Sequence, residues 1–337
     1  MKAILLTKYG PPEVLQLQVI EKPIPKDNEV LIKIHATNIT KGDCELRSFT
    51  FPFWIWIPLR IVMGIFIPRK KILGGYLSGE IEQVGKDVKR FNIGDQVYGI
   101  SGFTFGGYAE YLCLPDNPKA NVLVPKPPDM SWEEAATVGL GGMEALHFLR
   151  MANLTNGQEI LINGAGGSIG TYAVQLARFY GAVITCIDRK EKQDMLLSMG
   201  AKHVIDYLKE DFSKNGLKYD VIFDIVGNIS IGKAVKSLKS KGVFLIANPK
   251  LSHIFQRLWV SKTKNKKVLL DFTKHKLDDM LYLSELFEKG VIKPKIDKLY
   301  PMERIVEAHH YVESGRKEGD VVLSVDVNRV IEEKVQQ

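Results

Sequence analysis

A glycine-rich turn between an apolar stretch and a helix-forming stretch constrains the fold of this chain more than any other feature. The segment reads "EILINGAGGSIGTYAVQLA". A diphosphate binds where backbone N–H groups and the positive end of a helix dipole face it, with no side chain in the way. A strand, this turn, a helix and a second strand in succession therefore indicate a dinucleotide-binding parallel sheet, rather than a turn without a ligand.

The glycines of the turn have separate expected roles. Gly164 permits the tight turn, Gly167 lets the backbone approach the diphosphate, and Gly170 lets the helix pack close to the strand. The residues that we expect to contact the cofactor here are Gly164, Gly166, Gly167, Ser168, Ile169 and Gly170.

The next strand pattern ends in "TCIDRK", which bears on the choice of dinucleotide. Asp188 stands where an acid would accept the ribose hydroxyls of NAD, whereas Arg189 and Lys190 stand where cations would bind the 2′-phosphate of NADP. Two adjacent cations favour NADP(H), and NAD(H) stays possible. Tyr207, at the end of the third strand, is a candidate to stack nearby, and Gly227, which ends "YDVIFDIVG", is a further candidate for the cofactor site.

Strand and helix patterns alternate from about residue 127 onward. The strand patterns are "EILIN", "VITCI", "HVIDY", "YDVIFDIVG", "GVFLIAN" and "KVLLDF", and the helix patterns include "IGTYAVQLARFYGA" and "KEKQDMLLSMGA". The first helix begins with a capping-box pattern, Ser131 followed by Glu134. This alternation predicts an α/β fold with a doubly wound parallel sheet over residues 127–273.

The rest of the chain is rich in strand patterns and turns. "EVLIKIHATNI" alternates apolar and polar residues as a half-buried strand does, and a final strand pattern, "GDVVLSVDV", follows the helix pattern "KLDDMLYLSELFEKG". We therefore expect a second, β-rich domain made of residues 1–126 and 274–337, with the parallel-sheet domain inserted between its two parts.

Cysteine use and charge narrow the setting. Three cysteines without a pairing pattern fit a reducing compartment, and the first residues lack the cleavage site of a signal peptide, so we expect a cytoplasmic protein. The net charge of +7 includes lysine clusters at Ser261–Lys267 and Arg69–Lys71. Nucleic-acid binding would need aromatic residues between the basic ones or a reading helix, and the sequence shows neither.

An apolar run, "FPFWIWIPLRIVMGIFIP", covers residues 51–68 and is followed by the basic Arg69–Lys71. Pro52 and Pro58 interrupt it and Arg60 lies within it, so we do not expect it to span a membrane. The preferred interpretation is a wall or lid, with a short helix around Leu59–Ile67, that lines a pocket for a lipophilic substrate. Packing on the protein's own core or on a dimer partner, and shallow insertion into a membrane through Trp54 and Trp56, are the alternatives.

The chain resembles the medium-chain dehydrogenase/reductase superfamily, in its zinc-free quinone oxidoreductase branch, over nearly its whole length. The motifs that carry the resemblance are "MKAILLTKYGPPEVL", "GEIEQVGKDVKRFNIGDQVYG", "GGYAEY", "EEAATVGLGGMEALHFL", "GAGGSIGTYAVQLA", "MGAKHVIDY", "YDVIFDIVG" and "GRKEGDVVLSV". The resemblance implies a GroES-like β-rich catalytic domain, a Rossmann domain, a cleft between them for the nicotinamide, and a homodimer.

The chain departs from its zinc-dependent relatives at the metal ligands. They place a cysteine near Thr40 and a histidine where this chain has Gly75, and the four closely spaced cysteines of a structural zinc lobe are absent. Zinc needs ligands from Cys, His or carboxylate groups, so we expect no zinc. Glu144 is a second departure, because relatives have a small hydroxyl residue near the nicotinamide at this position.

Without a metal, hydride transfer to a quinone or an activated alkene needs placement of the acceptor and stabilisation of the charge that develops on oxygen. We therefore expect an NAD(P)H-dependent oxidoreductase with a small lipophilic carbonyl or quinone substrate. Thr40, Asp43 and Tyr76 are the candidates for the substrate site, and a turn-forming role is the alternative for Asp43. A zinc-free aldehyde or alcohol oxidoreductase, and a cofactor-binding protein with little catalysis that holds a partner, are the alternative functions.

Overall fold

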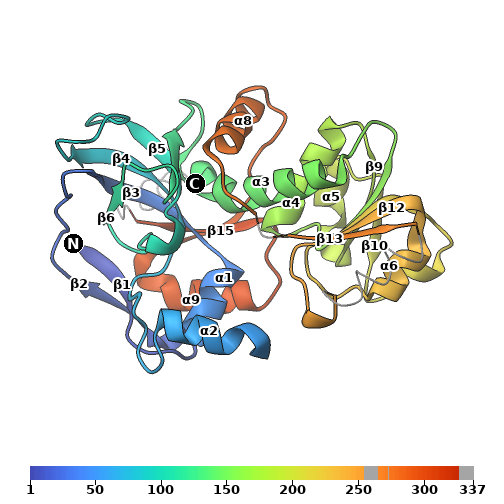
Figure 1. Cartoon of the computed structure of the whole chain (residues 1–337), viewed down its shortest axis with the longest axis horizontal. Helices are drawn as coiled ribbons and strands as arrows, with labels where there is room; N and C mark the ends of the chain where they lie inside the picture. The colour runs from blue at the N-terminus through green and yellow to red at the C-terminus, as the bar shows by residue number, and fades with distance from the viewer. Residues whose placement is uncertain (254–264, 272, 326–337) are drawn as a thin grey trace. The chain divides into compact units, whose positions relative to one another are not determined.

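The computed structural model describes residues 1–253, 265–271 and 273–325, except for the side chain of Trp54. The chain forms two compact units (Figure 1). The β-rich unit consists of Met1–Gly139, His275–Glu288 and Pro294–Gln337, and the parallel-sheet unit consists of Leu140–Lys274 and Lys289–Lys293. The domain boundaries at residues 126/127 and 273/274 stay a prediction.

The parallel-sheet unit contains six strands in the order β10-β9-β8-β11-β12-β13 among the described residues. The strands are β8 (Glu159–Asn163), β9 (Val183–Asp188), β10 (His203–Asp206), β11 (Tyr219–Asp224), β12 (Leu238–Ile246) and β13 (Lys267–Leu270). All neighbours are parallel. The chain enters at β8, builds outward to β10 and then returns to β11 on the other side of β8. The sheet is therefore doubly wound, and the predicted fold class is confirmed.

The apolar runs of these strands explain why the sheet is buried. Side chains of β8, β11 and β12 such as Leu161, Ile222 and Phe244 have no exposed surface. A parallel sheet covered on both faces needs such continuous apolar strands, because every second residue faces a helix on either side.

A long helix leads into the first parallel strand, and further helices connect the strands. They are α3 (Trp132–Ala152), α4 (Ser168–Phe179), α5 (Gln193–Met199) and α6 (Ile231–Ser237), with short 3-10 helices η3 (Lys190–Lys192) and η4 (Phe212–Lys214). The predicted capping box is present, since Ser131 and Glu134 exchange backbone-to-side-chain hydrogen bonds of 3.0 and 3.1 Å. The helix expected over "KEKQDMLLSMGA" is shorter than predicted, because its first turn is 3-10 and Gly200, at φ +118°, ends it.

The β-rich unit contains a two-stranded sheet and a seven-stranded sheet among the described residues. Its strands are β1 (Lys2–Leu6), β2 (Leu15–Val19), β3 (Glu29–Ile39), β4 (Tyr76–Val84), β5 (Gln96–Ile100), β6 (Tyr111–Pro115), β7 (Val122–Pro125), β14 (Ile296–Pro301) and β15 (Asp320–Ser324). The larger sheet has the order β14-β15-β3-β4-β5-β7, with β6 also on β3. The late strand β15 pairs antiparallel with β3, so the end of the described chain returns to this unit (Figure 1).

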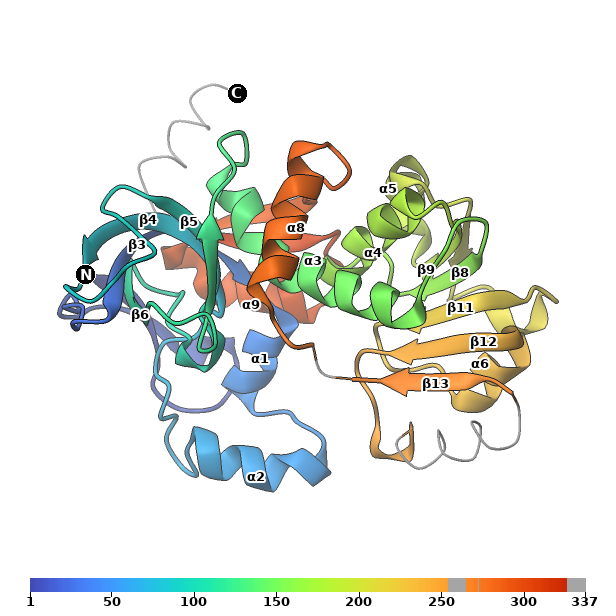
Figure 2. The same ribbon diagram turned by 45° about the horizontal axis from the view of Figure 1, so that its top comes forward.

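The β-rich unit also contains helices in the segments between its strands. They are η1 (Pro12–Val14), α1 (Lys41–Ser48), α2 (Phe53–Met63), η2 (Gly102–Thr104), α8 (Leu277–Glu288), η5 (Met302–Arg304) and α9 (Ile305–Glu313). Figure 2 shows α2, in light blue, beyond α1 at the edge of this unit.

The helix in the apolar run differs from the prediction. It covers Phe53–Met63 instead of Leu59–Ile67, with Pro52 as its N-cap and Pro58 inside it. Proline in a helix removes one hydrogen bond. Trp56, before Pro58, packs edge-on against the ring of Phe49, and the guanidinium of Arg60, after Pro58, lies over the same ring. The helix turns on both sides of Pro58 therefore contact Phe49. Among the described residues, no helix combines the length and the apolar character needed to cross a membrane.

Two predictions reach beyond the described residues. Ser261–Lys264, the first part of the predicted lysine cluster, lie outside them, and so do the last residues of the "GDVVLSVDV" pattern.

Candidate functional site

The glycine-rich turn joins the end of β8 to the start of α4, and open space lies beside it. Gly164 has φ +83°, a left-handed conformation that favours glycine. A Cβ atom at Gly170 would lie 2.3 Å from the carbonyl oxygen of Gly164 and 2.4 Å from that of Ala165. These two glycines are therefore required by the fold of the turn itself.

Gly167 differs from them, because the fold does not require it. It is the N-cap of α4, with extended backbone and no side-chain cap. A Cβ atom at this position would meet only the carbonyl oxygen of Gly164, at 3.6 Å, which is an ordinary contact. The space beside Gly167 is thus open, at the positive end of a helix of twelve residues. An anionic group can approach the first amides of α4 from this side.

Asp188 ends β9 and closes over the turn. Its Oδ2 accepts a hydrogen bond of 2.7 Å from the amide of Gly166, and its Oδ1 accepts one of 2.9 Å from the amide of Arg189. Lys192 places its Nζ 3.4 Å from the same Oδ1, and both side chains are buried. The carboxylate charge of Asp188 is therefore compensated by three donors of the protein.

Lys192 was not among the cofactor-site residues predicted from the sequence. It stands four residues after Asp188, but Asp188 ends a strand, so the helical spacing of opposite charges does not apply and the sequence carries no signal for this pair. Its stem also lies beside the turn, because a Cβ atom at Gly166 would meet its Cδ at 2.4 Å. Lysine is seldom buried without a partner. Its place between Asp188 and Gly166 makes it part of the candidate cofactor site.

Two of the predicted cofactor residues meet beyond Asp188. The Nε of Arg189 donates a 3.0 Å hydrogen bond to the hydroxyl of Tyr207, which follows β10. Both groups are accessible, and Lys190 beside them is exposed. The structure therefore brings Arg189, Lys190 and Tyr207 together at the carboxyl ends of β9 and β10, next to the turn.

A buried polar network occupies the point where the winding of the sheet reverses, between β8 and β11. Asp224, at the end of β11, accepts hydrogen bonds from the amides of Gly227 (2.9 Å) and Ile229 (2.8 Å) and from the Nδ2 of Asn163 (2.7 Å). Burial raises the pKa of Asp224. Ligands of doubly wound sheets bind at this reversal.

Gly227, predicted as a cofactor residue, lies in the loop that Asp224 holds. It has φ +76°, and a Cβ atom would lie 2.0 Å from the carbonyl oxygen of Asn248. Asn163 and Asp224 were not predicted from the sequence, although each is a polar residue that ends an apolar strand pattern.

In the β-rich unit, the candidates Thr40 and Asp43 form a capping box at the start of α1. The amide of Asp43 donates to the hydroxyl of Thr40 (3.0 Å), and the amide and hydroxyl of Thr40 donate to the Oδ2 of Asp43 (2.9 and 2.6 Å). The Oδ1 of Asp43 accepts a 3.1 Å hydrogen bond from the amide of Gly74. Burial raises the pKa of Asp43. These contacts give Asp43 a structural task, joining α1 to the segment before β4.

A second buried group lies next to this capping box. The ring of His309, on α9, has its Nε2 3.3 Å from the hydroxyl of Tyr108 and its Nδ1 3.4 Å from the Sγ of Cys44. Burial lowers the pKa of His309 to about 3 and raises that of the Cys44 thiol. A neutral imidazole beside a protonated thiol is not an activated nucleophile, because nucleophilic attack needs the thiolate.

Tyr76, the third candidate, begins β4 and is partly exposed. Its carbonyl oxygen accepts a 2.7 Å hydrogen bond from Thr37, and its ring lies 3.0 Å from where a Cβ atom of Gly139 would be. A Cβ atom at Gly75 would meet nothing within 4 Å. The catalytic or substrate-binding roles of Thr40, Asp43 and Tyr76 stay predictions.

The donor set does not fit a zinc ion. Within residues 1–253, 265–271 and 273–325, no group of three or more His, Cys, Asp or Glu side chains is placed to hold a metal. Glu144, the other departure from the related pattern, accepts a 2.6 Å hydrogen bond from the hydroxyl of Thr273. Its carboxylate is therefore engaged within the parallel-sheet unit.

A doubly wound sheet, a glycine turn with open space at the N-terminus of α4, and a compensated acid at the end of β9 define an α/β protein of the dinucleotide-binding class. Family models agree with this class. The alcohol dehydrogenase GroES-like domain matches residues 26–128, and the zinc-binding dehydrogenase domain matches residues 199–323.

Individual proteins narrow the class to a family. The chain is 31% identical to a quinone oxidoreductase of Sus scrofa, over 94% of this chain and 95% of that protein. It is 31% identical to a 2-methylene-furan-3-one reductase of Solanum lycopersicum, over 96% of this chain and 79% of that protein. The structure of a quinone oxidoreductase from Coxiella burnetii is similar with a TM-score of 0.85 at 29% identity, over 97% and 99% of the two chains.

The chain therefore belongs to the medium-chain dehydrogenase/reductase family, in its quinone oxidoreductase-like branch, and is an oxidoreductase. The resemblance stated from the sequence motifs is confirmed, and so is the GroES-like domain.

Proposed function

We propose that the protein reduces quinones or activated alkenes by hydride transfer from NADPH without a metal ion. The observation that carries this proposal is the open N-terminus of α4 at Gly167, next to an acid whose charge Lys192 compensates. The relatives support the acceptor class, since they are named for quinones and for a 2-methylene-furan-3-one, which are all conjugated carbonyl compounds.

Different residues would bind different parts of the cofactor. The start of α4 suits its diphosphate, because the N-cap Gly167 has no side chain and leaves the space at the positive end of the helix open. Arg189 and Lys190 suit a 2′-phosphate, because they are accessible cations at the end of β9. An uncompensated carboxylate at Asp188 would repel that phosphate. The contacts of Asp188 with Lys192 and two amides reduce this repulsion, which favours NADPH over NADH.

Hydride transfer to a conjugated carbonyl compound does not require a catalytic side chain that donates a proton. A bound reduced nicotinamide supplies the hydride, and the protein's contribution is to hold the acceptor and stabilise the oxygen that gains charge. Backbone N–H groups and water can do the latter in a conjugated acceptor. The capping-box contacts of Thr40 and Asp43 fit this picture, because they hold backbone in place rather than present a free acid.

A metal-free reaction is supported by the donor set among the described residues. The glycine at position 75 offers no side chain, and the nearby Cys44 is buried against His309. We also propose a homodimer and a cytoplasmic location.

The test uses chelator-treated protein and follows NADPH oxidation with a panel of quinones, enones and aldehydes, and NADP+ reduction with a panel of alcohols. We expect turnover with quinones or enones that added zinc does not increase. Turnover confined to aldehydes or alcohols would overturn the acceptor class, and activity that appears only with zinc would overturn the metal-free mechanism. Tight NADPH binding without turnover across the panel would instead indicate a cofactor-binding protein.

A further inference from the structure

The helix α2 has an apolar solvent-exposed side. Its only charged residue, Arg60, is directed inward, where its guanidinium lies 3.8 Å from the ring centre of Tyr9 and 4.4 Å from that of Phe49. Phe49 is buried and also packs edge-on against Trp56. The one charged side chain of α2 therefore contacts the rest of the protein, and the outward side of the helix carries no charged side chain.

Six exposed apolar residues on α2 and in the turn after it are here called the apolar face. It consists of Phe53, Ile57, Ile61, Ile65, Phe66 and Ile67, all exposed. Phe53, Ile57 and Ile61 are spaced by four residues and therefore share one side of α2, and Ile65, Phe66 and Ile67 follow in the turn after Gly64. Phe66 is 86% exposed. Contiguous apolar surface of this kind on a soluble protein marks a site of interaction.

The apolar face is held in place by polar contacts beneath it. The hydroxyl of Tyr9 donates to the carbonyl oxygens of Met63 (2.9 Å) and Gly64 (3.0 Å), and the Nε of Arg60 donates to that of Ile65 (2.7 Å). The amide of Arg69 closes the turn on Met63 at 2.8 Å. The exposure of Ile65–Ile67 is therefore a built feature of the turn.

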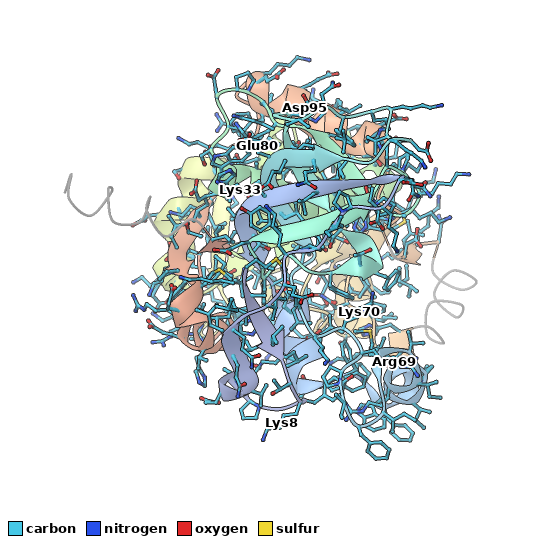
Figure 3. All side chains as sticks on the ribbon, turned by 90° about the vertical axis from the view of Figure 1, so that its left-hand side faces the viewer. Lys8, Lys33, Arg69, Lys70, Glu80 and Asp95 are labelled. Carbon is cyan, nitrogen blue, oxygen red and sulfur yellow. The ribbon has the colours of Figure 1, made fainter. Side chains whose placement is uncertain are left out.

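Positive charge borders the apolar face. Arg69, Lys70 and Lys71 follow it directly, and all three are exposed. None of them forms an ion pair with an acid in the part of the chain that the structure describes. In Figure 3, Arg69 and Lys70 lie beside α2 in the lower part of the view, where Lys8 also lies, whereas Glu80 and Asp95 lie at the top of the view, away from α2.

Negative charge is absent from this stretch of sequence. No Asp or Glu occurs between Glu45 and Glu80. An apolar surface next to unpaired cations, without acids, complements a lipid bilayer with anionic head groups, where apolar side chains enter the acyl boundary and cations meet the phosphates. The eleven residues of α2 are too few to cross a bilayer, which takes about 20.

We propose that α2 is a membrane-docking element that lies in the surface of an anionic bilayer. The apolar face enters the bilayer, and Arg69, Lys70 and Lys71 bind its head groups. This proposal does not depend on the reaction that the protein catalyses, because docking requires no turnover.

The test is co-sedimentation of the full chain with vesicles of phosphatidylcholine alone and with vesicles of equal parts phosphatidylcholine and phosphatidylglycerol. We expect binding to the anionic vesicles that weakens in high salt, since the Debye length shrinks. The variant Ile61→Ser/Ile67→Ser removes apolar surface and should bind at least about tenfold more weakly. Lys70→Gln/Lys71→Gln should weaken binding to anionic vesicles by about fivefold per lysine.

A matched control separates this surface from exposed isoleucine in general. Ile24→Ser/Ile93→Ser makes the same chemical change at positions of the same unit that are 86% and 68% exposed, against 56% and 64% for Ile61 and Ile67. The control should bind vesicles like the wild type.

Three results would overturn the proposal. The first is a wild type that does not sediment with anionic vesicles, or that binds neutral vesicles equally well. The second is equal weakening by the control variant. The third is a wild-type oligomer that dissociates, without any vesicles, in the Ile61→Ser/Ile67→Ser variant, because the apolar face would then be a subunit interface.

Discussion

Lys192 and Asp188 form a buried ion pair, with 3.4 Å between Nζ and Oδ1 and less than one-tenth of either side chain exposed. The pair lies directly against the turn that begins α4, because Oδ2 of the same carboxylate accepts the amide hydrogen bond of Gly166. The cofactor turn and the residue that ends the next strand are therefore one structural unit. Changes to either should affect both stability and cofactor choice.

The first prediction concerns the stability of this pair. Lys192→Met keeps the stem and removes the charge, which leaves Asp188 with two amide donors and no cation. We expect the free energy of unfolding to fall by about 2 kcal/mol, because a buried charge loses its partner. The double variant Asp188→Asn/Lys192→Met should recover part of the loss, measured by urea unfolding. Equal loss in the single and double variants would show that the unpaired charge of Asp188 does not explain the effect.

The second prediction concerns the choice of cofactor. Arg189→Ala should raise the Kd for NADPH about tenfold and leave that for NADH unchanged, because a charge-assisted hydrogen bond to the 2′-phosphate is lost. Lys202→Ala is the control, since it removes an exposed cation from the opposite end of β10. Titration calorimetry with both nucleotides checks this. An Arg189→Ala protein that keeps the wild-type ratio of the two Kd values would refute the assignment of NADPH.

The third prediction separates structural and catalytic roles of Asp43. Asp43→Asn has one acceptor oxygen where the carboxylate accepts three hydrogen bonds, from Thr40 twice and from Gly74. We expect a loss of about 1–2 kcal/mol in stability and an unchanged kcat/KM in the folded protein. Thr40→Ser, which keeps the hydroxyl, should change neither. A large fall in kcat without loss of stability would instead make Asp43 a residue of the reaction.

The fourth prediction follows from the pKa of His309, which burial lowers from 6.5 to about 3. Below pH 6.5 the unfolded chain binds a proton at this imidazole, whereas the folded protein does not until about pH 3. The unfolded state therefore gains protons as the pH falls, and stability decreases by up to about 1.4 kcal/mol per pH unit in that range.

The comparison that isolates His309 uses its neighbour. His309→Gln should flatten the decrease in the urea midpoint between pH 6.5 and pH 4, while His310→Gln, at an exposed position beside Glu13, should keep the wild-type slope. If the two variants show the same slope, the titration of His309 does not control acid stability.

The sequence predicts the parallel-sheet unit well because its signals are local. An apolar run, a glycine turn and a helix in succession describe β8 and α4, and each is a property of neighbouring residues. The turn residues Gly164 and Gly170 are required by contacts within the turn itself. Such requirements can be deduced without knowing the rest of the fold.

Lys192 and Asp43 show where local signals end. The burial of Lys192 depends on Gly166 in the preceding strand–turn–helix segment, and the role of Asp43 depends on the amide of Gly74, 31 residues away. The helix α2 is a similar case, since Pro58 indicates an interruption, but contacts with Phe49 hold both turns together. Long-range contacts decide these features, and periodicity does not report them.

Binding of NADPH by Gly167→Ala tests the central claim, that the cofactor lies in the open space beside Gly167, at the N-terminus of α4. The added methyl group fits the protein, with its nearest neighbour at 3.6 Å and an extended backbone that alanine adopts freely, but it fills the space that a diphosphate needs. Gly232→Ala, which also adds a methyl group in open space within α6, is the control. We predict wild-type melting temperatures for both variants, with NADPH affinity reduced about a hundredfold in Gly167→Ala alone. Unchanged affinity for NADPH in a folded Gly167→Ala protein would contradict the account.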